Sequence, residues 1–391
     1  MVELAVANSD SDAGAALPRA LPAWVYDNGE LNRLELQRLL LPSWQIACHV
    51  NSIAQSGDYV TFDLGPESVF VWRDRDRTIR AFHNVCRHRG ARLLDDSGNC
   101  PGTLTCPYHG WTYRQDGALI GVPSREGFPG LDRAEFGLKS VRVEVAFGFV
   151  FVAISGNPPP VADTWGPLLE DFSAYRFEEM VPLGPIRYET WDVDWKIAID
   201  NYLESYHVPI GHPGLNRMFT PDYEDQAAVP TIARGISWLR ERESSHWSER
   251  MYQRLVGKIV THLPERQRRS WRFYSALPNL GIDVFPEQMD FFQVLPRGPG
   301  KCVIRSGVFG LPDERPQMRA IRFLGNRINT QVNSEDRSLC ARVQRGLASG
   351  SYQPGPLSAL ERWMLEFHNL LRERIPEVRL ANAPAQFHGG Q

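Results

Sequence analysis

Apolar and polar residues alternate in short stretches from about residue 44 to residue 155, which is typical of strands rather than helices. The strand-like stretches are 59–63, 69–72, 79–82 and 149–154. Val141, Val143 and Val145 alternate with polar residues just before the last of them. This pattern predicts a small antiparallel β domain.

The pattern changes after three consecutive prolines at 158–160, which lack backbone donors and therefore mark a domain boundary. Beyond them, helical periodicity at 195–207, 335–348 and 357–375 is interspersed with strand-like stretches at 289–295 and 301–309. The expected fold class is α+β, with helices against an antiparallel sheet in the second domain. We expect an N-terminal arm and helix at 1–41, the β domain at 42–157 and the α+β domain at 158–391.

Composition narrows the class of protein. Of the 391 residues, 42% are hydrophobic and 23% are charged, and the net charge of −3 offers no general attraction for nucleic acid or an acidic membrane. The longest apolar run, near 147–154, is far shorter than the roughly 20 residues of a membrane-spanning helix. The first 20 residues do not resemble a secretory signal, so we expect a cytoplasmic protein without nucleic-acid or membrane partners.

Two loops in the predicted β domain each combine a cysteine with a histidine. Cys86 and His88 form the first pair, and Cys106 and His109 form the second. Two thiolates and two imidazoles fit a structural zinc site or a [2Fe–2S] cluster with two histidine ligands. Because each loop supplies one ligand of each kind, the spacing favours the cluster, in which both sulfurs face one iron and both imidazoles the other. The zinc site remains the alternative.

A second candidate metal site follows the three prolines. On the predicted helix 195–207, Glu204 and His207 share a face, and His212 follows five residues later. Pro209 and Gly211 allow the chain to fold His212 back toward His207. The alternative is a solvated helix face that carries two histidines by chance.

Two histidines need a carboxylate to complete the facial triad that leaves positions open on Fe(II). Asp336, at the start of the predicted helix 335–348, is the best candidate by context. Glu335 is its competitor. Acidic residues are common at helix N-termini for dipole reasons alone, so this part of the pattern carries little information by itself.

Taken together, these motifs resemble the large (α) subunits of Rieske non-haem iron oxygenases, the ring-hydroxylating dioxygenase family. The resemblance rests on the four Cys and His residues of the β domain, on 201–207 with His212, and on 333–336. It implies a Rieske β domain followed by a catalytic domain whose sheet curves around a helix. The implied ligands are Cys86, His88, Cys106 and His109 for a [2Fe–2S] cluster, and His207, His212 and Asp336 for mononuclear Fe(II).

The resemblance also implies roles for two residues near the mononuclear iron. Glu204 stands where the family has an acidic residue that bridges this iron to a cluster histidine of the neighbouring subunit, which implies a homotrimer. Asn201 is expected to lie near the iron and to orient substrate or oxygen, although a helix-capping or core hydrogen-bond role is an equal alternative. Both are expected to be catalytic residues in this sense.

Glu204 and the stretches 343–347 and 355–357 look like the branch that includes choline, glycine betaine, carnitine and stachydrine oxygenases. Ser205 and Val208 stand where the quaternary-ammonium enzymes tend to have cysteines, which argues against simple transfer of their substrate. We therefore first expect hydroxylation of an aromatic or related small substrate, by mono- or dioxygenation, as in aromatic hydrocarbon catabolism. Hydroxylation or oxidative N-demethylation of a quaternary ammonium compound is the alternative.

The resemblance implies O2 as co-substrate, and electrons that originate from NAD(P)H and arrive through a reductase or a ferredoxin. Arg87 and Arg89 flank the cluster ligand His88 and could dock an acidic electron carrier. Two other classes remain: a Rieske electron carrier without catalysis of its own, and a zinc-stabilised binding module. The electron carrier leaves about 230 residues and the His207/His212 pair without a role.

Overall fold

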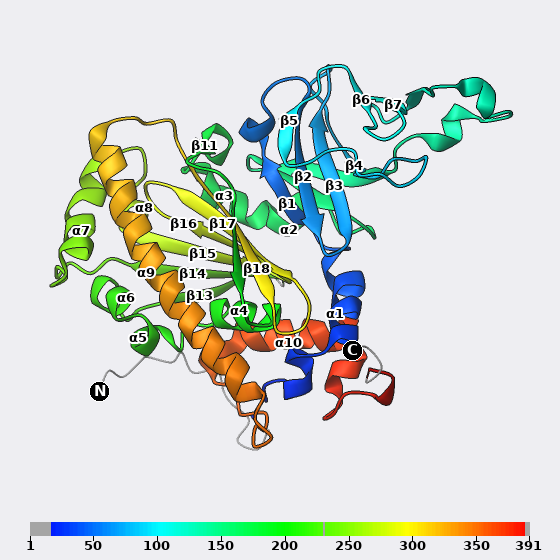
Figure 1. The fold of residues 1–391 in the computed structure, drawn as a ribbon. Coiled ribbons are helices and arrows are strands. Elements are labelled where there is room, and N and C mark those ends of the chain that lie inside the picture. The colour runs from blue at the N-terminus through cyan, green and yellow to red at the C-terminus, as the bar shows by residue number, and fades with distance from the viewer. Residues whose placement is uncertain (1–16, 230, 388–391) are drawn as a thin grey trace. The chain divides into compact units, whose positions relative to one another are not determined.

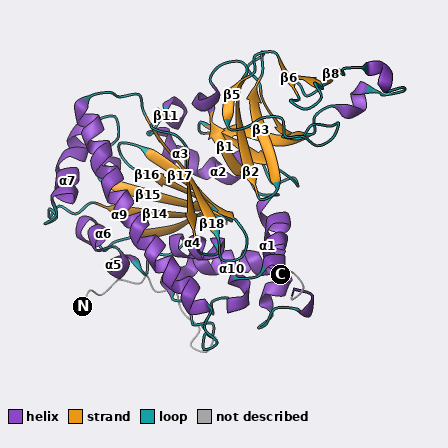
Figure 2. Ribbon diagram, in the orientation of Figure 1, coloured by secondary structure: helices purple, strands orange, loops and turns teal. Residues whose placement is uncertain are grey.

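The computed structural model describes residues 17–229 and 231–387, which form two compact units (Figure 1). One unit extends from Leu40 to Pro182, and the other combines the chain up to Leu39 with the chain from Leu183 onward. Both units mix strands with helices (Figure 2). The expected α+β class is confirmed. Among the described residues, no helix has the combination of length and apolar composition needed to cross a bilayer.

The first unit is built on an antiparallel sheet with the strand order β1-β10-β9-β4-β3-β2-β5, and a smaller antiparallel sheet, β6-β7-β8, adjoins it in sequence. This is the small β domain that the alternating pattern predicts. Its elements are β1 (Gln45–His49), β2 (Asp58–Leu64), β3 (Glu67–Arg73), β4 (Ile79–His83), β5 (Ser97–Asn99), β6 (Thr103–Thr105), β7 (Thr112–Arg114), β8 (Leu119–Gly121), β9 (Ser140–Ala146), β10 (Phe149–Ala153), α2 (Val161–Trp165), α3 (Leu169–Ser173) and β11 (Val181–Pro182).

The core of this unit lies where the two sheets contribute aromatic side chains. Phe70 of β3 packs 5.7 Å from Phe82 of β4, measured between ring centroids. Trp111 and Tyr113 extend the same buried cluster. The loops after β4 and β6 enter this core with their cysteines, so aromatic packing fixes both candidate ligand loops.

The second unit contains an antiparallel sheet with the order β18-β17-β16-β15-β14-β13, and β12 also pairs with β18. Its strands are β12 (Arg187–Trp191), β13 (Glu224–Val229), β14 (Ile232–Trp238), β15 (Ser270–Ala276), β16 (Leu280–Val284), β17 (Met289–Pro296) and β18 (Cys302–Gly310). Its helices are α1 (Gly29–Glu35), α4 (Trp195–Tyr202), α5 (Val208–Gly211), α6 (Pro213–Met218), α7 (Trp247–Ile259), α8 (Glu265–Arg268), α9 (Pro316–Leu347) and α10 (Arg362–Arg374).

The register of β16 and β17 determines what each face of this sheet presents. Asp283 pairs with Asp290, and Gly281 pairs with Phe292, so these four residues share one face. Tyr202 at the end of α4 packs on this face, with its ring 4.5 Å from that of Phe292. A Cβ on Gly281 would lie 2.9 Å from the Tyr202 ring, so only glycine allows α4 to approach this closely.

A buried ion cluster joins α4 to α1 within the second unit. Asp194 caps α4 by accepting a hydrogen bond from the Lys196 backbone. The Lys196 ammonium lies 2.7 Å from Glu35 of α1 and 2.7 Å from Asp194, and all three side chains are fully buried. The Trp195 indole donates to Glu35 as well. Because each carboxylate has several partners, the cost of burying these charges is offset.

Two predicted helix boundaries are wrong, and both matter for the site. The helix expected at 195–207 ends at Tyr202. The helix expected to begin at Glu335 begins at Pro316, nineteen residues earlier, with proline in its first turn. Its first half carries several arginines, which obscured an apolar stripe of Met318, Ile321, Leu324 and Ile328 that is buried in the structure. Asp336 therefore lies inside a long helix, not at a helix N-terminus.

Candidate metal centres

Two loops of the first unit hold the four predicted cluster ligands in matching backbone conformations. The Cys86 N–H donates to Ala91 O at 2.8 Å, and the Cys106 N–H donates to Trp111 O at 2.8 Å. Gly90 and Gly110 close the two loops with φ angles of +74° and +73°, which favour glycine. Each loop therefore presents its cysteine and histidine in the same way.

The environments of the cysteines and histidines differ. Cys86 and Cys106 are each 2% exposed, whereas His88 and His109 are partly exposed. The histidine rings lie 4.6 Å apart, and the His88 ring stacks on Trp111 at 4.9 Å. Burial, together with the charges of His109 and Arg89, lowers the pKa of His88 and so favours the neutral, metal-binding imidazole.

This arrangement fits a Rieske [2Fe–2S] cluster. The donors are two thiols and two imidazoles, and His88 Nδ1 is a buried nitrogen with no partner among the described residues. Tyr113, which the sequence analysis missed, lies with its hydroxyl 3.4 Å from Cys86 Sγ and accepts a hydrogen bond from the Arg87 N–H. Hydrogen bonds to the sulfurs are one of the means by which proteins set cluster potentials.

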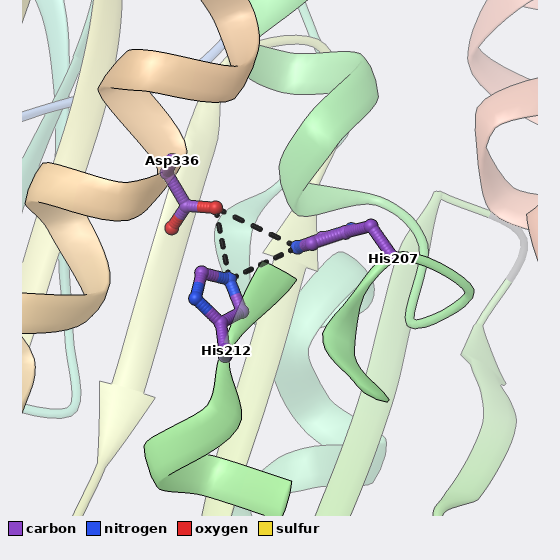
Figure 3. Close-up of side chains that lie close together, drawn as sticks. All are labelled: His207, His212 and Asp336. Carbon is purple, nitrogen blue, oxygen red and sulfur yellow. Dashed lines mark hydrogen bonds and ion pairs between the residues drawn. The ribbon is translucent and has the colours of Figure 1, made fainter. Parts of the chain in front are cut away.

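The second candidate centre brings together two histidines that are five residues apart and an aspartate from a distant part of the sequence (Figure 3). His212 Nε2 lies 3.0 Å from Asp336 Oδ1 and 3.1 Å from His207 Nε2. His207 Nε2 lies 3.5 Å from the same Asp336 oxygen. The three ligand atoms thus lie within 4.8 Å of one another. Two imidazoles and one carboxylate on one side of a metal ion are the donor set of non-haem Fe(II) oxygenases.

A single helical turn brings the two histidines together. After α4 ends, Glu204 accepts a hydrogen bond from the His207 N–H and also contacts His207 Nδ1. The short helix α5 then returns the chain, and His212 follows it directly. A Cβ on Gly211 would lie 2.9 Å from Leu339 Cδ1 and 3.2 Å from the His207 ring, so glycine avoids crowding at this close approach.

The electrostatics of this centre favour a bound cation. Although burial opposes ionisation, hydrogen bonds from His207 and His212 lower the pKa of Asp336 to about 2. Burial also opposes the charged form of His207, yet Asp336 and Glu204 raise its pKa to about 9. The site thus stabilises positive charge, which protons can supply and which a divalent metal would supply in their place.

The two residues predicted to be catalytic both contact predicted ligands. Asn201 donates to Asp336 Oδ1 at 2.8 Å, and Glu204 holds His207. Glu335, the predicted competitor of Asp336, instead bonds the far nitrogen of His212. Tyr202, Asp283 and Asp290 at the sheet face described above were not predicted from the sequence. For the two aspartates, a polar residue in an otherwise apolar strand was the available signal.

Family models of known proteins match both parts of the chain. Residues 43–140 match the Rieske [2Fe–2S] domain, and residues 177–377 match the catalytic domain of the ring hydroxylating alpha subunit. Choline monooxygenase from Arabidopsis thaliana is 30% identical over 90% of this chain and 82% of its own. The glycine betaine monooxygenase oxygenase subunit of Chromohalobacter salexigens is 28% identical over 87% of this chain and 82% of its own.

Solved structures show the same fold. A quaternary ammonium Rieske monooxygenase in complex with an inhibitor has a TM-score of 0.78 at 23% identity, over 92% of this chain and 96% of that one. Naphthalene 1,2-dioxygenase with bound indole has a TM-score of 0.71 at 21% identity, over 94% of this chain and 93% of that one. From the family match over both domains, the chain belongs to the Rieske oxygenase α subunits and is a Rieske-type oxygenase, close to the glycine betaine, choline and carnitine monooxygenases.

Proposed function

We propose that this chain is the oxygenase component of a multicomponent system that hydroxylates a carbon next to a positively charged nitrogen, as in a quaternary ammonium compound. Its curated relatives act on glycine betaine, choline and carnitine, as their names state. They favour the second expectation of the sequence analysis over the aromatic substrate that it placed first. The proposed ligands are the four loop residues for the cluster and His207, His212 and Asp336 for iron.

The observation that carries the substrate class is the pair Asp283 and Asp290. These carboxylates lie opposite each other on neighbouring strands, and no arginine or lysine of the described residues pairs with either. Burial raises the pKa of Asp283 to about 7, and burial together with Asp283 raises that of Asp290 well above its ordinary value. Two adjacent half-buried carboxylates without a counter-ion favour a cationic ligand.

The surroundings of this pair connect it to the mononuclear centre. The Tyr202 hydroxyl donates to Asp283 at 2.6 Å, and Tyr202 is adjacent in α4 to Asn201, which bonds Asp336. The charge of Asp336 contributes to the raised pKa of Asp283. The rings of Tyr202 and Phe292 on the same face offer π surfaces to an ammonium group. A substrate whose cationic end lies on this face would therefore lie near the triad.

The proposed reaction is a monooxygenation that consumes one O2, two electrons and two protons. When bound, the iron centres would supply O2 activation and single-electron transfer. One oxygen atom enters an N-methyl C–H bond, and the other leaves as water after uptake of two electrons and two protons. The electrons come from a reductase, because the chain resembles oxygenase subunits that need one. An N-hydroxymethyl product then loses formaldehyde and a proton and leaves the tertiary amine. The two carboxylates and the two aromatic rings described above hold the cation and so exclude competing substrates.

The test is a substrate panel with a surrogate reductase. Choline, glycine betaine and carnitine are compared with naphthalene and with 3,3-dimethylbutan-1-ol, the uncharged isostere of choline. We expect NADH-coupled O2 uptake and product formation with at least one ammonium compound, and little with the neutral molecules. Turnover of the aromatic compound in the absence of any ammonium turnover would refute the proposal.

A homotrimer is part of the proposal, because the resemblance gives Glu204 a role between subunits. Ile210 beside the triad is 87% exposed and Tyr206 is 58% exposed in the single chain, as expected for side chains that a neighbour covers. Light scattering coupled to size exclusion should give three times the mass of the 44.4 kDa chain. A monomer at working concentration would contradict this part.

A further inference from the structure

Glu335 and Asp336 are neighbours on α9, yet they contact His212 on opposite sides. Asp336 Oδ1 faces His212 Nε2 at 3.0 Å, and Glu335 Oε2 lies 2.8 Å from His212 Nδ1. Successive residues of a helix point about 100° apart, so one residue can reach the metal position while the next reaches behind the imidazole. With Glu335 accepting from Nδ1–H, the Nε2 lone pair is left free for a metal.

The Glu335 side chain is itself held in place. Its second oxygen, Oε1, accepts a hydrogen bond from Gln331 Nε2 at 2.9 Å, one helical turn earlier. Arg217 of α6 forms an ion pair with Glu249 at 2.6 Å. It also interacts electrostatically with Glu335. Both carboxylate oxygens therefore have partners.

His212 needs such an anchor because its own segment is short. It lies between α5, with four residues, and α6, with six residues, and its backbone is not helical. Helices of this length are not stable alone and do not fix a ring orientation. By contrast, α9 has 32 residues and also carries Asp336. An anchor on α9 therefore ties the imidazole to the same rigid element as the carboxylate ligand.

We propose that Glu335 is a positioning residue that fixes the His212 ring and its Nδ1–H tautomer, and so strengthens metal binding at His207, His212 and Asp336. The proposal rests on the triad being the iron site of the proposed function. Glu335 does for His212 what Glu204 does for His207, so each histidine has its own carboxylate. Loss of such an outer contact typically costs 10–100-fold in metal affinity.

The test compares Glu335→Ala, Glu335→Gln and Gln331→Ala with the wild type. Glu366→Gln is the matched control, because Glu366 is an exposed carboxylate of α10 in the same unit. Protein with its cluster intact is stripped of mononuclear iron, and Co(II) binding is titrated by its visible absorption and by chelator competition. Cluster absorption and melting temperature report folding.

We expect Glu335→Ala to bind Co(II) about 10–100-fold more weakly, with a changed visible spectrum and unchanged folding. Glu335→Gln should remain within about tenfold of wild type, because its amide oxygen can still accept from His212 while the Gln331 amide rotates. Gln331→Ala should fall between them, and Glu366→Gln should match wild type. Wild-type affinity and spectrum in a folded Glu335→Ala protein would overturn the proposal.

Asp336→Ala separates this outcome from a failure of the proposed function. If Asp336→Ala abolishes Co(II) binding while Glu335→Ala does not weaken it, only the positioning role is lost. If neither variant changes binding, the triad is not the metal site and the proposed function fails with it.

Discussion

Replacing Asp283 by asparagine should stabilise the protein, and by an amount that grows with pH. Asparagine keeps an oxygen that can accept the Tyr202 hydroxyl, which Asp283 now accepts at 2.6 Å. The substitution removes a carboxyl group whose ionised form is destabilised by its surroundings in the folded protein. Burial raises the pKa of this carboxyl from 3.8 to about 7, and the charge of Asp336 adds to the effect.

The free energy of unfolding depends on pH because the folded and the unfolded protein bind different numbers of protons. Between about pH 4 and pH 7 the folded protein holds a proton on Asp283 that the unfolded chain has already released, so the free energy of unfolding falls as pH rises. At about 1.4 kcal/mol per pKa unit, the full difference is about 4 kcal/mol above pH 7, as an upper bound. Below pH 4 the contribution is near zero. Because Asp283 and Asp290 interact, the titration of the two groups extends over a wider pH range.

The assay is denaturant unfolding followed by tryptophan fluorescence from pH 5.5 to pH 8.5. Chelator-treated protein is used, because Fe(II) at the triad would itself favour ionised carboxylates. Wild type should lose stability relative to Asp283→Asn mainly up to about pH 7, and Asp222→Asn, which changes an exposed carboxylate, should follow wild type. Parallel curves for wild type and Asp283→Asn would refute the reasoning. The same variant should bind an ammonium substrate more weakly, so that stability and function oppose each other.

Three further outcomes are expected. Asp336→Ala should lower the iron content from about three to about two per chain with unchanged cluster absorption, measured by metal analysis; loss of the cluster instead would place the carboxylate elsewhere. Tyr113→Phe should lower the cluster potential in voltammetry, because Cys86 Sγ loses its 3.4 Å contact with a hydroxyl, whereas the exposed Tyr108→Phe should not. Lys196→Met should lower the free energy of unfolding by about 3–5 kcal/mol, because the buried carboxylates of Glu35 and Asp194 lose their cation. An unchanged free energy of unfolding would show that these carboxyl groups are protonated.

The cluster loops were the part of the site that the sequence could predict most directly. Each ligand pair is local in sequence, and the glycine after each pair has a backbone requirement that the structure contains. The His207 and His212 pair is also local, separated by one helical turn. Short-range spacing was therefore enough to predict the cluster ligands and the two histidines of the mononuclear centre. The helix expected to hold His207 nevertheless ends five residues before it.

The parts of the site that could not be predicted from the sequence depend on contacts between distant segments of the chain. Asp336 was the better candidate by context, but its neighbour Glu335 was a competitor, and the family resemblance was needed to choose between them. Which of the two faces the histidines is decided by the rotation of α9 against the sheet. Asp283 and Asp290 each interrupt an apolar strand, but only the register of β16 and β17 brings them together. Register is a property of the folded sheet, and a single sequence does not determine it.

The length of α9 has a consequence for how this chain can vary. Asn326 accepts a hydrogen bond from Gln288 at 2.7 Å, at the turn between β16 and β17, and Asp336 lies ten residues farther along the same helix. Inserting or deleting one residue between them would swing the carboxylate about 100° around the axis and shift it by about 1.5 Å. The ten-residue interval between Asn326 and Asp336 must therefore keep its length if the carboxylate is to face the two histidines.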